Sequence, residues 1–177
     1  MAEDAREGTG SRRLLQDWAA NSGRPGIQVV LLFFRLAQAA RGQGTGLRRL
    51  AAAPVLLLYR VVALSLFGID IPAATAVGPG LAIHHGMGLV VNRFVRIGPS
   101  VTLRHNTTLG GRTGDDDCPV LGSHVDVGPH SVVLGAIDVG DRAVIGAASV
   151  VLSDVPASAT VAGNPARVLR VRGENRS

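Results

Sequence analysis

The chain has 177 residues, which is enough for one domain with a sizeable core and a helical arm. It is 46% hydrophobic but only 3% aromatic, so the core must be aliphatic, and aromatic residues that could stack on nucleic-acid bases are scarce. The net charge of +5 belongs to residues 1–67, which carry nine arginines and four acidic residues, whereas residues 68–177 carry nine of each. We therefore expect no nucleic-acid partner. The N-terminal arginines are expected to lie on solvated helix faces or to contact an anionic membrane surface.

The N-terminus and the cysteine content both bear on the compartment. The chain begins Met-Ala-Glu-Asp, which is acidic where a secretory signal is basic. Its single cysteine, Cys118, excludes an intramolecular disulfide and argues against a cysteine-built metal site. We therefore expect a cytoplasmic protein.

A helical arm is predicted for residues 17–67, with turn signals at 21–25 and 42–46. Its last part predicts a helix from Pro54 to Phe67, with proline in the first turn and a stop at Gly68.

Two apolar stretches in this arm, 27–34 and 50–67, are too short to span a membrane. Arg35 ends the first and Arg60 interrupts the second, so neither reaches the roughly 18 uncharged residues that a spanning helix needs. We expect both stretches to pack against the body of the protein or between subunits, with peripheral membrane contact as the alternative.

From residue 71 onward an aliphatic residue recurs at every sixth position. A shift of two residues after Leu89 and a gap of twelve, or two hexads, after Leu109 interrupt the series. Glycine follows the aliphatic residue in seven of the thirteen hexads, which we attribute to turns whose φ is difficult for a residue with a Cβ. The thirteen aliphatic positions are Ile71, Val77, Ile83, Leu89, Ile97, Leu103, Leu109, Leu121, Val127, Val133, Val139, Ile145 and Val151.

A period of six is typical of the hexapeptide β-helix, in which three hexads form one triangular coil. Stacked coils bury a continuous aliphatic column that no single hexad could bury alone. The sequence therefore predicts an all-β parallel β-helix over residues 68–155, preceded by a helical region over 1–67 and followed by an arginine-rich tail over 156–177.

The gap after Leu109 contains an acidic segment. Residues 112–119 read Arg-Thr-Gly-Asp-Asp-Asp-Cys-Pro, with Asp115 in the slot that should be aliphatic. Such a segment cannot line the column, so we expect it to protrude as a loop that either contributes to a site or is a surface insertion.

Two histidines that interrupt the hexads are candidates for chemistry. His85 and His105 fall one coil apart, so we expect their rings to stack on one face about 5 Å apart, the spacing of neighbouring strands. Such a pair favours neutral imidazole, the form that removes a proton from an alcohol near pH 7. A metal site would need a third ligand, and His124 and His130 are placed in other coils, so no metal is expected.

Two further features could complete a catalytic site. Asp70, about one coil below His85, either orients the imidazole or serves as a turn residue ahead of Pro72. Gly110 and Gly111 either offer backbone N–H groups to a developing oxyanion or are ordinary turn glycines.

Several motifs, taken together in order and spacing, resemble the serine O-acetyltransferases, and the branch assigned to colanic-acid and capsule biosynthesis is more similar still. The motifs are Gly68-Ile69-Asp70-Ile71-Pro72, Ile83-His84-His85-Gly86-Met87-Gly88, Thr107-Thr108-Leu109-Gly110-Gly111, Ile145-Gly146-Ala147-Ala148-Ser149-Val150-Val151-Leu152 and Gly163-Asn164-Pro165-Ala166-Arg167. The branch adds Arg104-His105, Cys118-Pro119 and the helix from Ala53 to Arg60.

This resemblance implies a left-handed β-helix, a homotrimer with sites between adjacent subunits, and acetyl-CoA as the acyl donor. It implies that His85 is the general base and that Asp70 is its dyad partner. It also implies a CoA channel lined by Gly110, Gly111, Gly128, Ala147 and Ala148.

The departures from the serine acetyltransferases concern the acceptor. The resemblance aligns His84 with an aspartate, Arg93 with a glutamate, and Asp117-Cys118-Pro119 with Arg-His-Pro. A free amino acid needs a cation for its carboxylate, and Asp117 has the wrong sign, which argues against free serine. Cys118 is interpreted as lining the substrate pocket, in preference to a nucleophile, because no base is evidently paired with it.

The sequence therefore predicts an acetyl-CoA-dependent O-acetyltransferase that acts on a hydroxyl of a sugar or specialised metabolite by direct attack on the thioester. His85, Asp70 and His105 are the predicted catalytic residues, and His84 and Arg93 are expected in the substrate pocket with Asp117 and Cys118. Serine as the acceptor is the first alternative, and a non-catalytic β-helix scaffold is the second.

Overall fold

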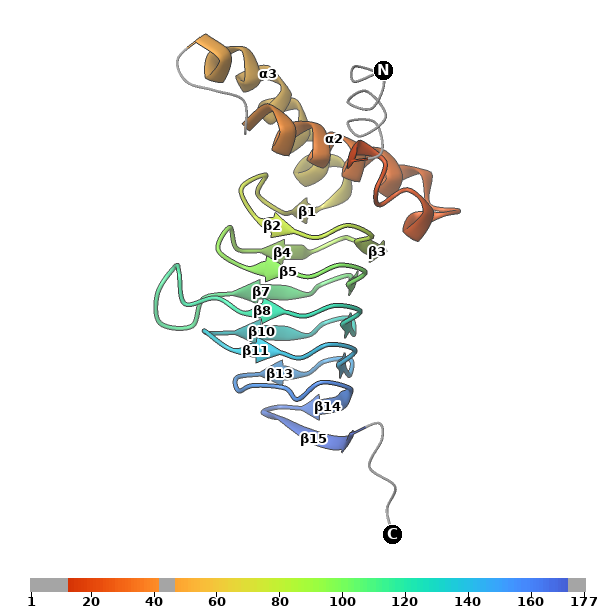
Figure 1. Ribbon diagram of the computed structural model, residues 1–177, viewed down its shortest axis with the longest axis vertical. Coiled ribbons are helices and arrows are strands. Elements are labelled where there is room, and N and C mark those ends of the chain that lie inside the picture. Colours follow the sequence, from red (N-terminus) through yellow and green to blue (C-terminus); the bar gives the residue numbers. More distant parts are fainter. Residues whose placement is uncertain (1–12, 42–46, 172–177) are drawn as a thin grey trace, which may run out of the picture.

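The computed structural model describes residues 13–41 and 47–171, so the turn predicted at 42–46 and both ends of the chain lie outside the described residues. Figure 1 shows a pair of helices lying across one end of a long stack of short strands. In the described part of the chain, no helix is long and apolar enough to cross a membrane.

The helical arm consists of η1 (Ala19–Asn21), α2 (Pro25–Arg41), α3 (Leu47–Val61) and the π-helical segment η2 (Val62–Leu66). The prediction that a helix begins at Pro54 is wrong, because α3 begins at Leu47 and contains the proline. Buried side chains lie at helical spacing on both sides of Pro54, namely Ala52, Tyr59 and Ala63. Their packing therefore outweighs the one hydrogen bond that the proline removes. The predicted stop at Gly68 is confirmed, since this residue has a φ of 62° and its N–H bonds to the Leu64 carbonyl oxygen.

Short strands form three faces of a triangular coil, and each strand pairs with the equivalent strand one coil further along. The first face comprises β1 (Ile69–Asp70), β4 (Leu89–Val91), β7 (Thr108–Gly110), β10 (Val132–Leu134) and β13 (Val150–Val151). The second face comprises β2 (Ala76–Val77), β5 (Arg96–Ile97), β8 (Val120–Leu121) and β11 (Asp138–Val139). The third face comprises β3 (Ala82–His84), β6 (Thr102–Arg104), β9 (Asp126–Val127), β12 (Val144–Ile145), β14 (Ala159–Gly163) and β15 (Ala166–Val171).

The left-handed parallel β-helix expected from the hexads and the resemblance is confirmed, with about five turns. The pairing between coils is parallel, and only β14 and β15 pair antiparallel. One aliphatic residue from each strand points inward and stacks on its counterpart, as Ile83 does on Leu103. This column is the core, and it supports the turns at which the candidate residues lie.

Two interruptions of the hexads differ from the sequence prediction. The extra two residues lie between Ile83 and Val91, not after Leu89, because Val91 takes the column position next to Leu109 while Leu89 pairs with Ile69. The gap after Leu109 spans a single side of the coil, since Leu121 stacks on Ile97 of the second face. It is therefore one hexad with an insertion, not two hexads.

The explanation of the repeated glycines also needs correction. None of the seven glycines that follow a column residue has a positive φ, and the left-handed turn positions hold residues such as Ser100, Asn106 and His124. Six of the seven, all except Gly110, are needed for space instead. A Cβ on Gly98 would lie 2.6 Å from the backbone carbonyl carbon of Gly122 in the next coil.

The stacking continues beyond Val155, where the sequence places the end of the repeat. Val155 bridges to Val139, and β14 pairs in parallel with β12 before β15 folds back on it as an antiparallel strand. The hairpin covers the last edge of the third face, which would otherwise be free to pair with another chain.

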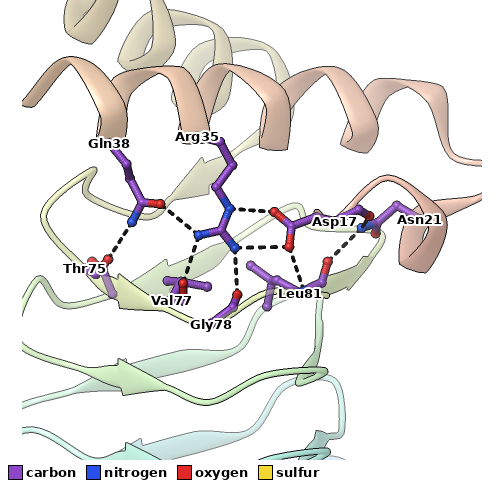
Figure 2. Close-up of polar contacts among 8 residues, drawn as sticks. All are labelled: Asp17, Asn21, Arg35, Gln38, Thr75, Val77, Gly78 and Leu81. Carbon is purple, nitrogen blue, oxygen red and sulfur yellow. Dashed lines mark hydrogen bonds and ion pairs between the residues drawn. The ribbon is translucent and has the colours of Figure 1, made fainter. Parts of the chain in front are cut away.

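Polar side chains of the helical arm cover the open edge of the first coil (Figure 2). Asn21 accepts a hydrogen bond from the Ile83 N–H and donates one to the Leu81 carbonyl oxygen, so it replaces the missing strand beside β3. Asp17 accepts from the Leu81 N–H at 2.9 Å. The backbone groups of Leu81 and Ile83 beside β3 are therefore satisfied without a further coil.

A buried ion pair completes this cap. Arg35 donates to Asp17 at 2.7 and 3.1 Å and also to the carbonyl oxygens of Val77 and Gly78, while Gln38 donates to Thr75 (Figure 2). Arg35 and Asp17 are both almost fully buried. In the sequence Arg35 marks only the end of an apolar stretch, because its partners lie 18 to 43 residues away along the chain.

Candidate active site

The turns that lead from the third face to the first form one edge of the coil, here called the histidine edge (residues 85–88, 105–107, 128–131 and 146–149). His85 lies in the turn that holds the two extra residues and has a φ of 54°. His85 lines a cavity of about 430 Å³. Its left-handed backbone conformation is one that asparagine tolerates but most residues avoid. The other lining residues are Arg24, Pro25, Gly26, Ile27, Leu66, Phe67, Gly86 and Met87.

Three histidine rings follow one another along this edge. The ring of His105 lies edge-on to that of His85, with centroids 6.3 Å apart, so the two are neighbours as predicted but do not stack at 5 Å. His130 lies edge-on to His105 at 5.0 Å, and its N–H bonds to the His105 carbonyl oxygen. His130 lies in the coil that follows that of His105, and counting the gap after Leu109 as two hexads does not predict that the two rings are neighbours. The His105 Nδ1 atom is buried and has no hydrogen-bond partner within the described ranges.

His84 does not lie beside His85 in the cavity. Its Nδ1 atom is 2.6 Å from Nη1 of Arg24, and because arginine only donates, Nδ1 must accept and the neutral ring carries its proton on Nε2. Burial, followed by the charges of Arg24 and Arg104, lowers the pKa of His84. His84 therefore positions Arg24, which itself lines the cavity of His85.

The turns from the first face to the second form a different edge, here called the loop edge (residues 71–75, 92–95, 111–119 and 135–137). A cavity of about 510 Å³ lies there, lined among others by Asp70, Arg93, Gly110 and Gly111. Asp70 lies 3.9 Å from Arg60. Within the described chain, no hydrogen bond or ion pair joins Asp70 to His85, so a single chain does not form the predicted dyad.

Residues 112–119 leave the coil between β7 and β8 as a projecting loop (Figure 1). Asp117 is held inside it, accepting hydrogen bonds from the backbone N–H and the hydroxyl of Thr113 and from the Ala136 N–H. These hydrogen bonds, first that of the Thr113 hydroxyl, lower the pKa of Asp117. The Asp117 carboxylate therefore supports the loop, and Gly111 does so too, since a Cβ there would collide with the Gly114 carbonyl oxygen.

Cys118 is buried beneath the same loop. Its thiol lies 3.2 Å from the Asp115 carbonyl oxygen, to which it donates. Burial first, and then the neighbouring aspartates, raise the pKa of the Cys118 thiol. A nucleophilic cysteine requires the opposite shift, so the geometry favours a structural role.

The remaining candidates for CoA contact lie on the histidine edge, in the turn that holds His130 and in the turn one coil further along. Gly128 packs against the next coil, where a Cβ would lie 2.6 Å from the backbone nitrogen of Ala147. Ala148 has a φ of 55°, and its N–H bonds to the Pro129 carbonyl oxygen. The predicted site residues thus divide between two edges, with His85, His105, Gly128, Ala147 and Ala148 on the histidine edge.

Comparison with known proteins supplies the family. No family model matches the chain. It is 39% identical over 158 residues to the putative colanic acid biosynthesis acetyltransferase WcaB of Escherichia coli K12, covering 88% of this chain and 98% of the relative. A serine acetyltransferase from Brucella abortus in complex with coenzyme A superposes with a TM-score of 0.75 at 31% identity, covering 93% of this chain and 69% of that one. Soybean serine acetyltransferase complexed with serine gives 0.77 at 30% identity, with 93% and 71% coverage.

The chain belongs to the family of serine acetyltransferases and colanic acid biosynthesis acetyltransferases. It is therefore an acyltransferase, and the resemblance stated from its motifs is confirmed. Relatives with both names match the chain, so the comparisons leave the acceptor of this acetyltransferase open between a sugar and serine.

Proposed function

We propose that this acetyltransferase transfers an acetyl group from acetyl-CoA to a hydroxyl of a sugar or other specialised metabolite, with His85 as the general base. The observation that carries the proposal is the position of His85 in an irregular turn beside a cavity, where its ring is exposed to a ligand and is not sealed in the core. The donor is supported by the family and by the similar Brucella enzyme in complex with coenzyme A. The cytoplasmic location expected from the sequence stays a prediction.

The chemistry follows from one proton transfer. An alcohol is a weak nucleophile until a base removes its proton, and His85 would accept that proton as the oxygen attacks the thioester carbonyl carbon. The new C–O bond forms, and backbone N–H groups such as those of Gly110 and Gly111 would stabilise the oxyanion. Its collapse breaks the C–S bond, and the proton on His85 then passes to the departing thiolate.

We infer that the complete site forms between two subunits of a homotrimer. Asp70 and the glycine pair lie on the loop edge, whereas His85 and the small residues Gly128, Ala147 and Ala148 lie on the histidine edge. One chain cannot bring these groups together, because the first face separates its two edges. A neighbouring subunit could supply the second edge, which would let Asp70 orient His85 across the interface.

The projecting loop supports a metabolite hydroxyl over free serine. The resemblance implies that the serine acetyltransferases recognise serine with an Arg-His pair at this place. Here the corresponding residues are Asp117, which is hydrogen-bonded within the loop, and Cys118, which is buried. Neither residue offers a cation to an amino-acid carboxylate. Serine remains the second candidate, favoured by the likeness to the soybean enzyme complexed with serine.

The test replaces His85 without disturbing its backbone. His85→Asn keeps a residue that tolerates a positive φ, and His124→Asn is the matched control, because His124 has a φ of 57° and is exposed on another edge. CoA release from acetyl-CoA is followed with L-serine and with a panel of sugars. Loss of a general base is expected to lower kcat by about 10²–10⁴-fold.

Calorimetry with CoA separates the possible outcomes. The proposal expects wild-type affinity for CoA in both variants and loss of turnover only in His85→Asn. Full turnover by His85→Asn would overturn the assignment of the base. Turnover with L-serine alone would replace the proposed acceptor, and absence of CoA binding by the wild-type protein would favour the scaffold alternative.

A further inference from the structure

A cluster of arginines surrounds a second cavity at the loop edge, and neither the sequence analysis nor the proposed mechanism uses it. This cavity of about 300 Å³ lies between the helical arm and the first coil. Arg41 reaches it from the end of α2, Arg60 from α3 and Arg93 from the turn after β4. Of the three arginines, the sequence points only to Arg93 as a candidate. Arg41 and Arg60 come from helices, and the hexads do not predict where those helices lie over the first coil.

The charge around this cavity is unbalanced. Among the described residues that line it, Asp70 is the one acidic residue, and it lies 3.9 Å from Arg60. Three arginines and one aspartate leave two positive charges in excess. Since Arg60 and Asp70 are both solvent-accessible, the pair offsets only part of the field.

One of the three guanidinium groups is restrained by a neighbouring aromatic ring, and the polar group of Tyr59 is already hydrogen-bonded. The Arg93 guanidinium lies over the ring of Phe94, 4.5 Å from its centroid, which restrains the side chain without neutralising it. The hydroxyl of Tyr59, which also lines the cavity, donates to the Ile71 carbonyl oxygen at 2.6 Å. The arginines are thus the groups left to meet a ligand, and guanidinium groups match carboxylate and phosphate oxygens in geometry and charge.

We propose that this cavity binds an anionic group, a carboxylate or a phosphate, on the acetyl acceptor. The inference rests on the proposed function, because it places the acceptor beside Asp70. Asp70, Pro72 and Arg93 also line the larger cavity that contains Gly110 and Gly111, so the two cavities adjoin. An acceptor anchored by its anion in the smaller cavity would extend its hydroxyl toward the larger one.

The test compares acceptors that differ only in charge. Methyl glucuronide is compared with methyl glucoside, glucose 1-phosphate with glucose, and L-serine with ethanolamine, using CoA release with the full-length enzyme. The ratio of kcat/KM within each pair measures charge selectivity and distinguishes a carboxylate from a phosphate. Replacing acetyl-CoA by its 3′-dephospho form tests whether the arginines serve the donor instead.

Three variants address the cluster, Arg41→Gln, Arg60→Gln and Arg93→Gln. Arg96→Gln is the matched control, because Arg96 is an exposed arginine on β5 of the second face and lines neither cavity. Each cluster variant is expected to lower the ratio of kcat/KM for the anionic acceptor over its neutral partner about three- to tenfold, whereas Arg96→Gln leaves this ratio as in the wild type. The selectivity should also fall as salt is added, because exposed charges are screened.

The outcomes separate this inference from the proposed function. Equal kcat/KM for charged and neutral acceptors, unchanged in the cluster variants, would overturn the anion site and leave the acetyltransferase proposal standing. A rise in KM for acetyl-CoA that disappears with the dephospho form would assign the arginines to the donor and also overturn it. Absence of transfer to every acceptor, with CoA still bound, would instead contradict the proposed function.

Discussion

The cap over the first coil offers a direct test of how the helical arm stabilises the β-helix. In Asp17→Leu the guanidinium of Arg35, whose side chain is 4% exposed, loses hydrogen bonds of 2.7 and 3.1 Å. The Leu81 N–H loses its acceptor as well. Removing one partner of a buried pair costs about 3–5 kcal/mol, because the other charge stays buried without compensation. That is a large part of the roughly 5–15 kcal/mol that stabilises a typical domain.

A double-mutant cycle separates the pair from its surroundings. Arg35→Met leaves the Asp17 carboxylate buried, so it is expected to cost about as much as Asp17→Leu. The double variant leaves no buried charge, and it loses mainly the hydrogen bonds to the Val77 and Gly78 carbonyl oxygens, worth about 1 kcal/mol each. It should therefore be less destabilised than the sum of the single variants by at least about 1 kcal/mol.

Urea unfolding measures these differences, with circular dichroism for the β-helix and fluorescence of Trp18 for the cap. Trp18 is the single tryptophan of the chain and lies next to Asp17, so its emission reports locally. If the single variants each cost under about 1 kcal/mol, or if their costs simply add, the cap does not depend on this pair and the reasoning fails.

Two further predictions concern pH and packing. Because the folded-state pKa of His84 is lowered, the unfolded chain takes up a proton first as pH falls below about 6.5, and the free energy of unfolding decreases until the folded-state pKa is passed. Urea midpoints from about pH 8 to about pH 5 should therefore fall more steeply for the wild type than for His84→Gln, and identical slopes would contradict the lowered pKa of His84. Gly98→Ala should destabilise the protein by about 1–3 kcal/mol, because its Cβ would meet the Gly122 backbone, whereas at Gly110 the nearest atom is 3.7 Å away and Gly110→Ala should cost less. Thermal unfolding of the two variants compares them directly, and equal losses would mean that the coils separate easily.

The sequence predicts the β-helix well because the periodicity and the core have the same physical cause. An inward side chain in every hexad must be aliphatic whichever coil it belongs to, so Ile83, Leu103 and Val127 reveal the column without any knowledge of contacts. The prediction that His85 and His105 are neighbours follows from this period and is confirmed by their rings.

Register is harder to predict than periodicity. Two extra residues between Ile83 and Val91 leave both Leu89 and Val91 buried, so the hexads alone do not show which one continues the column. The insertion after Leu109 has the length of a hexad, which makes it look like a further side of the coil and places His130 away from His105. Packing of the helical arm on the body is expected from its apolar stretches, but its polar contacts are not predicted, because Asp17 and Asn21 bond to backbone groups that any sequence would offer.

The same geometry explains why a site in this fold needs more than one chain. Each face is a flat ladder of two- or three-residue strands along most of its length, and such a surface does not surround a ligand. Functional groups therefore gather where the coil is irregular, and here the widened turn of His85 and the loop at 112–119 lie at opposite edges of the first face. Had His85 and Asp70 been adjacent, one chain would suffice. Their separation is what we infer a three-fold assembly to overcome, by setting the histidine edge of one subunit against the loop edge of its neighbour.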